Sequence, residues 1–339
     1  MQKTEAFVLH RFGSPEQAFR LETVELPDLQ DDEVLIENEG FGLNYADVMA
    51  RNGLYRETPP LPCVLGYEVV GKIIQTGSKV PESWKEKRIV AFTRFGGYAK
   101  HSIVKLTSIA EIGELPAETA MALATQCVTA LYMVDRAANV QQGDRVLVHA
   151  AAGGVGSLLV QLCKLRGAHV TAKVGSAEKA TFVQSLGADG VINYREKDYA
   201  AEIGEQRLDV SFNPVAGDTF PTDLSLLRAG GRIVLFGGSA LKKGGWKLFK
   251  GLNFVRKMKL LVPIALMMRS RGVIGVNMLK IGDERPELLG QLLGESVELC
   301  RSAKITVTSG GKFSSKQLFE AHKLLESGKS IGKISVIWE

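Results

Sequence analysis

The sequence predicts an α/β protein in which a doubly wound parallel sheet is inserted into a β-rich domain. Three observations support this prediction: short strand-like segments over roughly the first 110 residues, strands alternating with helices over 145–278, and a final helix and strand similar in character to the opening part. A length of 339 residues suits two domains of about 150 residues each. We therefore expect one domain at 1–125 plus 284–339 and a second at 126–283.

The composition is that of an ordinary globular chain, with 45% apolar and 23% charged residues, which excludes the disordered and collagen-like classes. The four cysteines form no Cys-x-x-Cys pair, so a zinc knuckle and a redox dithiol are not expected. The polar N-terminus lacks the pattern of a secretory signal, and we expect a cytoplasmic protein. A net charge of +5 is too mild an excess to indicate nucleic-acid binding.

The opening domain is predicted from short segments that favour strands and are separated by Gly, Pro, Asp and Asn. These segments are 6–10, 33–38, 69–76, 88–92 and 98–104. From Pro116 the character changes, because proline is common at a helix start and 117–139 is rich in alanine. We expect a long helix there.

The second domain is predicted from apolar strands that alternate with helices. The strands are expected at 145–149, 169–174, 190–193, 209–212, 232–236 and 272–278, and the helices at 155–166, 177–186 and 219–228. Most of these strands are continuously apolar, which indicates a parallel sheet covered on both faces. A helix over 315–327 and a strand over 333–338 then return the chain to the first domain.

A glycine-rich turn follows the first of these strands, at 146–156 (Val-Leu-Val-His-Ala-Ala-Ala-Gly-Gly-Val-Gly). In the dinucleotide fingerprint G-x-G-x-x-G, Ala151, Gly153 and Gly156 take the three glycine positions. Gly153 would let the backbone approach a pyrophosphate, and Gly156 would let the helix pack closely on the strand. The turn therefore predicts a Rossmann-type cofactor site.

The dinucleotide is usually selected at the end of the second strand, where an acid binds the ribose 2′-hydroxyl. Residues 173–179 carry no acid at the strand end, and Ser176 and Lys179 could instead donate hydrogen bonds to a 2′-phosphate. A solvated helix start is the alternative role for these two residues. The missing acid together with the two donors favours NADPH.

These motifs combine with others along essentially the whole chain: 42–47 (Gly-Leu-Asn-Tyr-Ala-Asp), 53–55 (Gly-Leu-Tyr), 65–71 (Leu-Gly-Tyr-Glu-Val-Val-Gly), 187–189 (Gly-Ala-Asp), 193–195 (Asn-Tyr-Arg) and 331–333 (Ile-Gly-Lys). The chain resembles a zinc-free medium-chain dehydrogenase/reductase of the quinone oxidoreductase family. Its insert after Gly238 is most similar to the vesicle amine transport protein homologues. The resemblance implies a Rossmann NADPH-binding domain inserted into a GroES-like catalytic domain.

The resemblance also implies roles for individual residues. Asn44 and Tyr55 would be the catalytic residues, facing the nicotinamide and the substrate. The implied cofactor contacts are Asn44, Thr129, Gly153, Gly154, Val155, Gly156, Ser176, Lys179, Tyr194, Phe236, Gly237, Gly238, Lys329 and Lys333. Asn213 departs from the family pattern, because many relatives carry an aspartate there, and this leaves the local cofactor contact open.

A catalytic metal is not expected. Zinc-dependent relatives have a cysteine near the position of Asn44 and a histidine at that of Tyr67, whereas no cysteine occurs here from Val64 to Gln126. The chemistry that remains is hydride transfer from NADPH to a quinone or an α,β-unsaturated carbonyl, with Asn44 or Tyr55 hydrogen-bonding the acceptor oxygen and water supplying the proton. An enoyl-thioester reductase and a low-activity NADPH-binding adaptor are the alternatives. Asp47 is expected to be a structural residue that holds a loop or caps a helix, and His149 to be a core or surface histidine.

A basic insert is the last notable feature. Ten basic and no acidic residues occur over 240–282, and apolar residues recur every third position from Trp246 to Met258, which predicts an amphipathic helix. The apolar run 260–268 is too short to span a bilayer. Two interpretations stay open: a helix that covers the substrate cleft or a dimer interface, and a peripheral membrane contact through 242–271. The family pattern implies a homodimer through the strand at 272–278.

Overall fold

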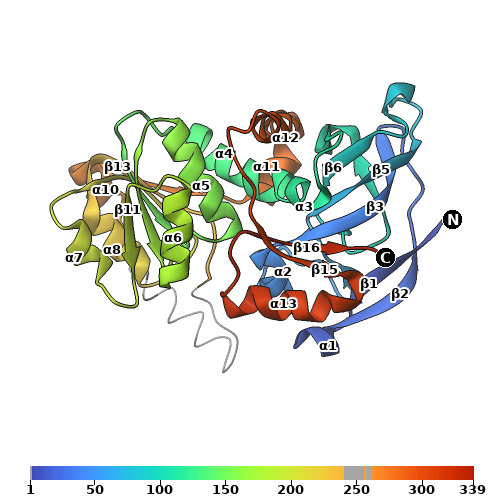
Figure 1. The fold of residues 1–339 in the computed structure, drawn as a ribbon, viewed down its shortest axis with the longest axis horizontal. Helices are drawn as coiled ribbons and strands as arrows, with labels where there is room; N and C mark the ends of the chain where they lie inside the picture. The colour runs from blue at the N-terminus through green and yellow to red at the C-terminus, as the bar shows by residue number, and fades with distance from the viewer. Residues whose placement is uncertain (1, 240–255, 257, 259–260) are drawn as a thin grey trace. The chain divides into compact units, whose positions relative to one another are not determined.

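The computed structural model describes residues 2–239, 256, 258 and 261–339. The chain divides into two compact units (Figure 1): Met1–Val128 with Leu279–Glu339, which we call the outer unit, and Thr129–Met278, which we call the inserted unit. The borders expected from the sequence are 125/126 and 283/284.

The outer unit is built mainly from antiparallel strands. One sheet has the order β2-β1-β4, and a larger one has the order β15-β16-β3-β5-β6-β8, with β7 also paired to β3. The strands are β1 (Lys3–Leu9), β2 (Phe19–Glu25), β3 (Glu33–Leu43), β4 (Cys63–Val64), β5 (Glu68–Thr76), β6 (Arg88–Phe92), β7 (His101–Lys105), β8 (Ile109–Glu111), β15 (Ser309–Ser314) and β16 (Lys333–Ile337). The helices are α1 (Pro15–Ala18), α2 (Tyr45–Arg51), α3 (Ala117–Ala120), α11 (Met278–Glu284), α12 (Pro286–Arg301) and α13 (Leu318–Ser327).

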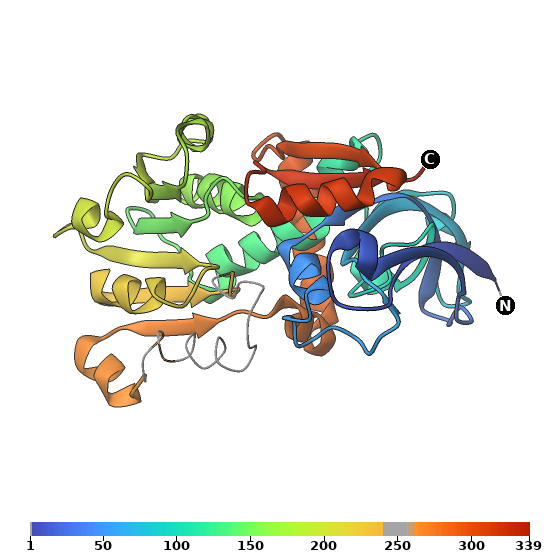
Figure 2. The same ribbon diagram turned by 90° about the horizontal axis from the view of Figure 1, so that it is seen from below.

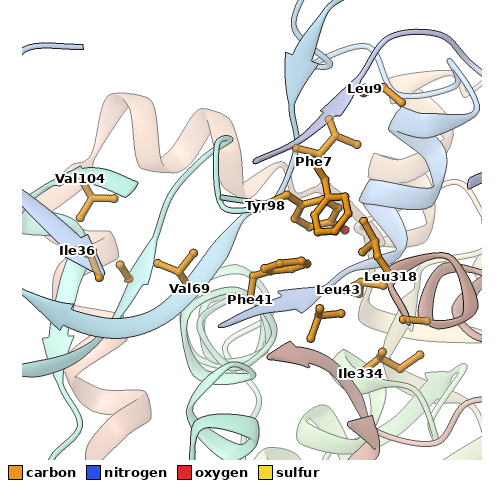
Figure 3. Packing of buried hydrophobic residues seen from close by; sticks show 14 of the residues in the cluster. Phe7, Leu9, Ile36, Phe41, Leu43, Val69, Tyr98, Val104, Leu318 and Ile334 are labelled. Carbon is orange, nitrogen blue, oxygen red and sulfur yellow. The ribbon is translucent and has the colours of Figure 1, made fainter. Parts of the chain in front are cut away.

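The core of the outer unit joins both ends of the chain. The rings of Phe41 and Tyr98 stack with centroids 4.4 Å apart, and Leu318 and Ile334 pack in the same cluster (Figure 3). Phe41 and Ile334 are both fully or almost fully buried, on neighbouring strands β3 and β16. The returning C-terminal segment is therefore part of the first domain, as predicted.

The inserted unit is a six-stranded parallel sheet in the order β11-β10-β9-β12-β13-β14. In Figure 1, α5 and α6 lie on one face of this sheet and α7 and α8 on the other. This arrangement confirms the predicted doubly wound Rossmann-type fold. The strands are β9 (Arg145–His149), β10 (His169–Val174), β11 (Gly190–Asn193), β12 (Leu208–Asn213), β13 (Leu227–Leu235) and β14 (Gly272–Gly275), and the helices are α4 (Val128–Leu131), α5 (Gly154–Leu165), α6 (Ala177–Ser185), α7 (Tyr199–Ile203), α8 (Thr219–Leu226) and α10 (Pro263–Arg269).

The predicted long helix at 117–139 is wrong in detail. It breaks up into α3, α4 and two π-helical segments, Leu123–Cys127 and Tyr132–Ala137. In the first of these the N–H of Cys127 bonds to the carbonyl of Ala122 at 2.9 Å. Such π segments widen a helix locally and often occur near functional sites.

The strand expected at 272–278 is also shorter than predicted. β14 ends at Gly275, because Met278 already begins α11. β13 begins earlier than expected, at Leu227, and β2 lies in a segment for which no strand was predicted. After Phe19, the side chains of β2 are exposed or half-exposed, so this segment has little apolar periodicity from which a strand could be predicted.

The amphipathic helix expected at 246–258 lies outside the described residues apart from Arg256 and Met258. Beyond it, α10 exposes Ile264, Met267 and Met268, whose exposed fractions are 60%, 76% and 82%. Over the part of the chain that the structure describes, the helices include none with both the length and the apolar character needed to cross a bilayer.

Candidate cofactor and active sites

The glycine loop links β9 to α5 in the inserted unit. A Cβ atom at Gly156 would lie 2.8 Å from the Cα of Ala151 and closer still to the carbonyl oxygen of Ala150, so only glycine fits there. Ala150 itself turns the chain with a φ of 50°. Gly153 is the N-cap of α5, and no side chain among the described residues caps this helix end. The first turn of α5 therefore offers backbone N–H groups and partial positive charge to an anion.

A second group of residues lies where β10 and β11 end. The Ser176 hydroxyl accepts a hydrogen bond from the backbone N–H of Lys179 at 3.3 Å and so caps α6. Tyr194 is 51% exposed and lies over Gly175, where a Cβ atom would come within 2.7 Å of the tyrosine hydroxyl. Burial, together with the charge of Arg195, lowers the pKa of Lys179. The structure thus brings Ser176, Lys179 and Tyr194 together at the carboxyl ends of β10 and β11. It adds Arg195, to which no role was assigned from the sequence.

The inserted unit also contains a buried polar network around Asp223, which was not predicted from the sequence. The Asp223 carboxylate on α8 accepts hydrogen bonds from His149 at 2.9–3.1 Å, Tyr199 at 2.9 Å and Ser211 at 2.7 Å. Burial acts to raise the pKa of Asp223, but the charge and hydrogen bonds of its partners outweigh it and lower the pKa. Lys173 lies 3.4 Å from the ring centre of Tyr199, and burial lowers its pKa to about 8. The network ties the ends of β9, β10 and β12 together.

Asn213, the departure from the family pattern, belongs to this network. Its Nδ2 donates to Asp223 at 2.7 Å, and its Oδ1 accepts from the backbone N–H groups of Val215 and Ala216 at 2.9 and 2.8 Å. An aspartate at this position could not donate to Asp223 and would place two carboxylates in contact. The amide therefore suits its neighbours and shapes the turn after β12.

In the outer unit, Asn44 follows β3 and begins α2. Its backbone N–H donates to Oδ2 of Asp47 at 2.8 Å, so the Asp47 side chain reaches back to the start of the helix. Asp47 is fully buried, and burial raises its pKa to about 7. Asp47 therefore has the helix-capping role that the sequence analysis expected.

The side-chain amide of Asn44 lies in a buried cluster of polar groups. Its Nδ2 donates to Oε1 of Glu68 at 2.8 Å, while its Oδ1 accepts from Nζ of Lys333 at 3.1 Å and from Nε2 of Gln126 at 3.4 Å. Lys333 and Glu68 also form a direct ion pair, with side chains 1% and 0% exposed. Gln126 was not predicted from the sequence, and Glu68 was noted only within the motif at 65–71, without a role of its own.

Tyr55 and Tyr67 are neighbours in the same unit. Their rings meet edge to face with centroids 6.3 Å apart. Burial, assisted by the charge of Glu57, raises the pKa of Tyr55 to about 12, and burial raises that of Tyr67 further. Both phenols are therefore protonated at neutral pH, and Tyr55 can donate a hydrogen bond.

The remaining predicted site residues occupy varied surroundings. Thr129 is buried in α4. Phe236, Gly237 and Gly238 follow β13, at the end of the parallel sheet where the glycine loop follows β9. Gly154 and Val155 are half-buried in the first turn of α5. Lys329 is exposed after α13, unlike the buried Lys333. Asn44, Tyr55, Lys329 and Lys333 lie in the outer unit, and the others in the inserted unit.

Cysteine and histidine do not gather around these residues. Within the described part of the chain, no group of three or more His, Cys, Asp and Glu side chains is arranged to hold a metal ion. The four cysteines are free thiols, of which Cys127 and Cys163 are buried. Asn44 and Tyr67 carry an amide and a phenol, and neither is a zinc ligand of the kind that cysteine and histidine provide.

Comparison with known proteins supports the resemblance. Residues 30–125 match the family described as "Alcohol dehydrogenase GroES-like domain", and residues 154–293 match "Zinc-binding dehydrogenase". The chain is 36% identical over 230 residues to "Probable quinone oxidoreductase" of Schizosaccharomyces pombe, covering 67% of this chain and 69% of the relative. It is 29% identical over 301 residues to the human "Synaptic vesicle membrane protein VAT-1 homolog", covering 87% and 76%.

A solved structure agrees over nearly the full length. The crystal structure of Escherichia coli quinone oxidoreductase complexed with NADPH superposes with a TM-score of 0.84 at 28% identity, covering 98% of this chain and 99% of that one. The glycine loop, the six-stranded parallel sheet and the outer unit around Asn44 belong to the same fold. The chain is therefore a member of the medium-chain dehydrogenase/reductase superfamily, in the branch of oxidoreductases that contains the quinone oxidoreductases and the VAT-1 homologues.

Proposed function

We propose that this chain is an NADPH-dependent reductase of quinones or α,β-unsaturated carbonyls that works without a metal ion. The observation that carries the proposal is the donor set of the outer unit, an oriented amide at Asn44 and a protonated phenol at Tyr55. Hydrogen-bond donors of this kind can polarise an acceptor that is already electrophilic, but they cannot replace a Lewis acid in the oxidation of a simple alcohol.

The inserted unit is suited to a phosphorylated dinucleotide. Gly153 lies at the N-terminus of α5, where free backbone N–H groups can bind a pyrophosphate, and Gly156 lets this helix pack closely on the turn after β9. Ser176, Lys179, Tyr194 and Arg195 offer hydroxyl and cationic groups to a 2′-phosphate. Bound there, NADPH would supply the hydride.

The side chains around Asn44 would orient the acceptor and stabilise the charge it gains. Negative charge develops on the acceptor oxygen during reduction, and an oriented N–H or O–H donor stabilises it by about 3 kcal/mol. Asn44 and Tyr55 are the donors of the outer unit suited to this task. We propose that water supplies the proton that completes the reduction.

The direct test is the oxidation of NADPH and NADH by the purified protein with quinones, enones and enoyl thioesters as acceptors. We expect turnover with quinones or enones and a clear preference for NADPH. Absence of NADPH binding, or alcohol oxidation that depends on added zinc, would contradict the proposal. Turnover that is confined to crotonyl thioesters would instead identify an enoyl-thioester reductase.

A second candidate is a low-activity NADPH-binding adaptor that contacts a membrane surface. It is favoured by the exposed apolar side chains of Ile264, Met267 and Met268 in a segment with no acidic residue over 240–282, and by the name of the human VAT-1 relative. Tight NADPH binding with negligible turnover, together with binding to anionic vesicles that is lost when the basic residues of 242–271 are replaced, would support it. We otherwise retain a cytoplasmic location as our proposal.

We also propose that the chain forms a homodimer. β14 pairs with β13 and forms one edge of the parallel sheet, where Figure 2 shows it as the orange strand. A second copy could extend the sheet at this edge, as strands with open backbone groups commonly do. Light scattering after size-exclusion chromatography should give twice the mass of the 36.8 kDa chain, and the chain mass itself would contradict the proposal.

A further inference from the structure

We propose that Glu68 and Lys333 are positioning residues that hold the Asn44 amide in a single orientation and leave one of its N–H groups for the acceptor oxygen. The inference rests on the proposed function, because it assigns the donor role to Asn44. It adds the two charged residues through which that donor is set. Lys333 would then act through Asn44 rather than by touching the cofactor.

The hydrogen bonds of Asn44 account for three of its four bonding positions. A side-chain amide has two donor hydrogens on nitrogen and two acceptor lone pairs on oxygen. Oδ1 accepts from Nζ of Lys333 at 3.1 Å and from Nε2 of Gln126 at 3.4 Å, and Nδ2 donates to Oε1 of Glu68 at 2.8 Å. Among the residues that the structure describes, the second hydrogen on Nδ2 has no partner, which leaves it for a ligand.

The charges of the pair decide which way the amide faces. Turning the Asn44 amide over would place its NH₂ group against the ammonium of Lys333 and its carbonyl oxygen against the carboxylate of Glu68. Each of these contacts is attractive in the observed orientation and would be repulsive in the other. The ion pair therefore selects one of the two orientations.

The pair itself is held on all sides. Nζ of Lys333 donates to Glu68, to Oδ1 of Asn44 and to the carbonyl of Leu43 at 3.2 Å, which uses its three hydrogens. Oε2 of Glu68 accepts from the backbone N–H of Thr125 at 2.9 Å. With exposures of 0% and 1%, neither side chain can exchange its partners for bulk water.

Gly42 makes the space for this arrangement. A Cβ atom at this position would lie 2.6 Å from Oε1 of Glu68 and 2.8 Å from Nζ of Lys333. Gly42 lies on β3, opposite Ser335 of β16 and two residues before Asn44. The backbone of β3 thus approaches the ion pair where any side chain would displace it.

The charges of Glu68 and Lys333 also act on the negative charge that develops on the acceptor oxygen. A carboxylate alone beside Asn44 would repel the negative charge that develops on an acceptor oxygen. Lys333 balances that charge, and the Glu68 contact directs the amide hydrogens. An oriented donor loses no free energy to reorganisation when the reaction occurs, which is the source of its catalytic effect.

The test uses the double variant Glu68→Gln/Lys333→Met, because removing only one partner would leave the other charge buried without compensation and could prevent folding. The matched control is Glu111→Gln/Lys87→Met, which removes an exposed pair of the same unit whose side chains are 45% and 34% exposed. Circular dichroism and NADPH titration establish that both variants fold and bind the cofactor, with a Kd within about threefold of the parent's.

The first readout is the NMR signal of the Asn44 side-chain amide, assigned by its disappearance in Asn44→Ala. In the unaltered protein, one hydrogen should exchange with solvent at least about tenfold more slowly than the other, because one is bonded to Glu68. The double variant should lose this difference and the control should keep it. Equal exchange of the two hydrogens in the unaltered protein would refute the inference without any variant.

The second readout is turnover. We expect kcat of the double variant to fall about 100-fold. Adding Asn44→Ala should cause no further loss, because all three substitutions act on the same donor, the oriented N–H of Asn44. Losses that multiply with Asn44→Ala, or an unchanged kcat, would overturn the inference. If the unaltered protein reduces no acceptor, the proposed function fails, and the amide signal still decides whether the pair holds Asn44.

Discussion

Nε2 of His149 lies 2.9 Å from Oδ2 of Asp223, and both side chains are buried in the inserted unit. His149 is the last residue of β9 and stands directly before the glycine loop, while Asp223 lies on α8. The contact therefore links the end of β9, next to the glycine loop, to α8, which follows β12 in the sequence. The Asp223 carboxylate is the common acceptor for donors on β9, β12 and α7.

Asp223→Asn should destabilise the protein by about 3 kcal/mol. An asparagine would turn an NH₂ group towards donors such as Ser211 and Tyr199 and would leave His149 without a carboxylate. Urea unfolding followed by circular dichroism measures the loss. The exposed Glu205→Gln is the control and should change stability by less than about 0.5 kcal/mol. A midpoint for Asp223→Asn equal to that of the control would show that the network contributes nothing.

Gly156→Ala should weaken both NADPH binding and stability. The new methyl group would collide with the backbone of Ala150 and Ala151, which forces the glycine loop away from α5. We expect a loss of about 1–3 kcal/mol in stability and a Kd for NADPH raised at least about tenfold. Fluorescence titration provides the Kd. Gly190→Ala is the control and should be tolerated, because the nearest atom to its Cβ would be the Thr171 hydroxyl at 3.4 Å. Similar effects in the two variants would count against the close approach of Gly156 to the backbone of Ala150 and Ala151.

Lys179→Glu should reduce the preference for NADPH over NADH at least about tenfold. The substitution replaces a cation near Arg195 by an anion that repels a 2′-phosphate, and a contact of this kind is worth up to about 4 kcal/mol. The ratio of kcat/KM for the two cofactors is the measurement. The control Arg136→Glu makes the same change of charge at an exposed residue before β9, at the opposite end of that strand from the glycine loop. An unaltered preference in Lys179→Glu would remove this residue from the cofactor site.

Tyr55→Phe should lower kcat about tenfold, the equivalent of one hydrogen bond, and leave the Kd for NADPH unchanged. The phenol is protonated at neutral pH because burial raises its pKa to about 12, so it is a donor throughout the working range. Steady-state kinetics with a quinone acceptor separates kcat from KM. Tyr132→Phe, in the inserted unit, should have no effect. If both variants are fully active, Tyr55 has no role in turnover.

His322 should make the protein less stable in mild acid. Burial and the charge of Arg51 lower its pKa from the ordinary value of 6.5 to about 3, so between these values the unfolded chain binds a proton that the folded protein does not. Stability therefore falls as the pH falls through this window, by about 2 kcal/mol from pH 7 to pH 5. His322→Gln, which can still bond to the hydroxyl of Tyr98, should lack this part of the pH dependence in urea unfolding.

The control for this pH effect is His169→Gln, since His169 is exposed at the start of β10. It should follow the pH dependence of the unaltered protein. The interpretation fails if His322→Gln has the same slope between pH 7 and pH 5 as the control.

Features that depend on neighbouring residues could be predicted from the sequence. The glycine loop combines an apolar strand, small residues and a helix within 146–156, and the close approach at Gly156 follows from that pattern alone. The alternation of strands and helices likewise predicts the parallel sheet. Ser176 and Lys179 are only three residues apart in the sequence, and their place just after β10 could be predicted from it.

Features that depend on distant residues could not be predicted. The His149–Asp223 contact joins positions 74 residues apart, and the Lys333–Glu68 pair joins positions 265 apart. No motif connects either pair, and a lone histidine or glutamate in an apolar segment gives no sign of its partner. The π-helical segments near Cys127 also escaped prediction, because periodicity does not distinguish them from an ordinary helix.

The return of β16 to the side of β3 has a consequence for biosynthesis. Asn44 and Lys333 are 289 positions apart, so a ribosome extends the chain for roughly 15 to 60 seconds between them. During this interval the inserted unit can emerge and fold, while Glu68 still lacks its cation. The polar cluster around the Asn44 amide is thus completed only after Lys333 has been added, so a nascent chain can form its Rossmann-type unit before this cluster is assembled.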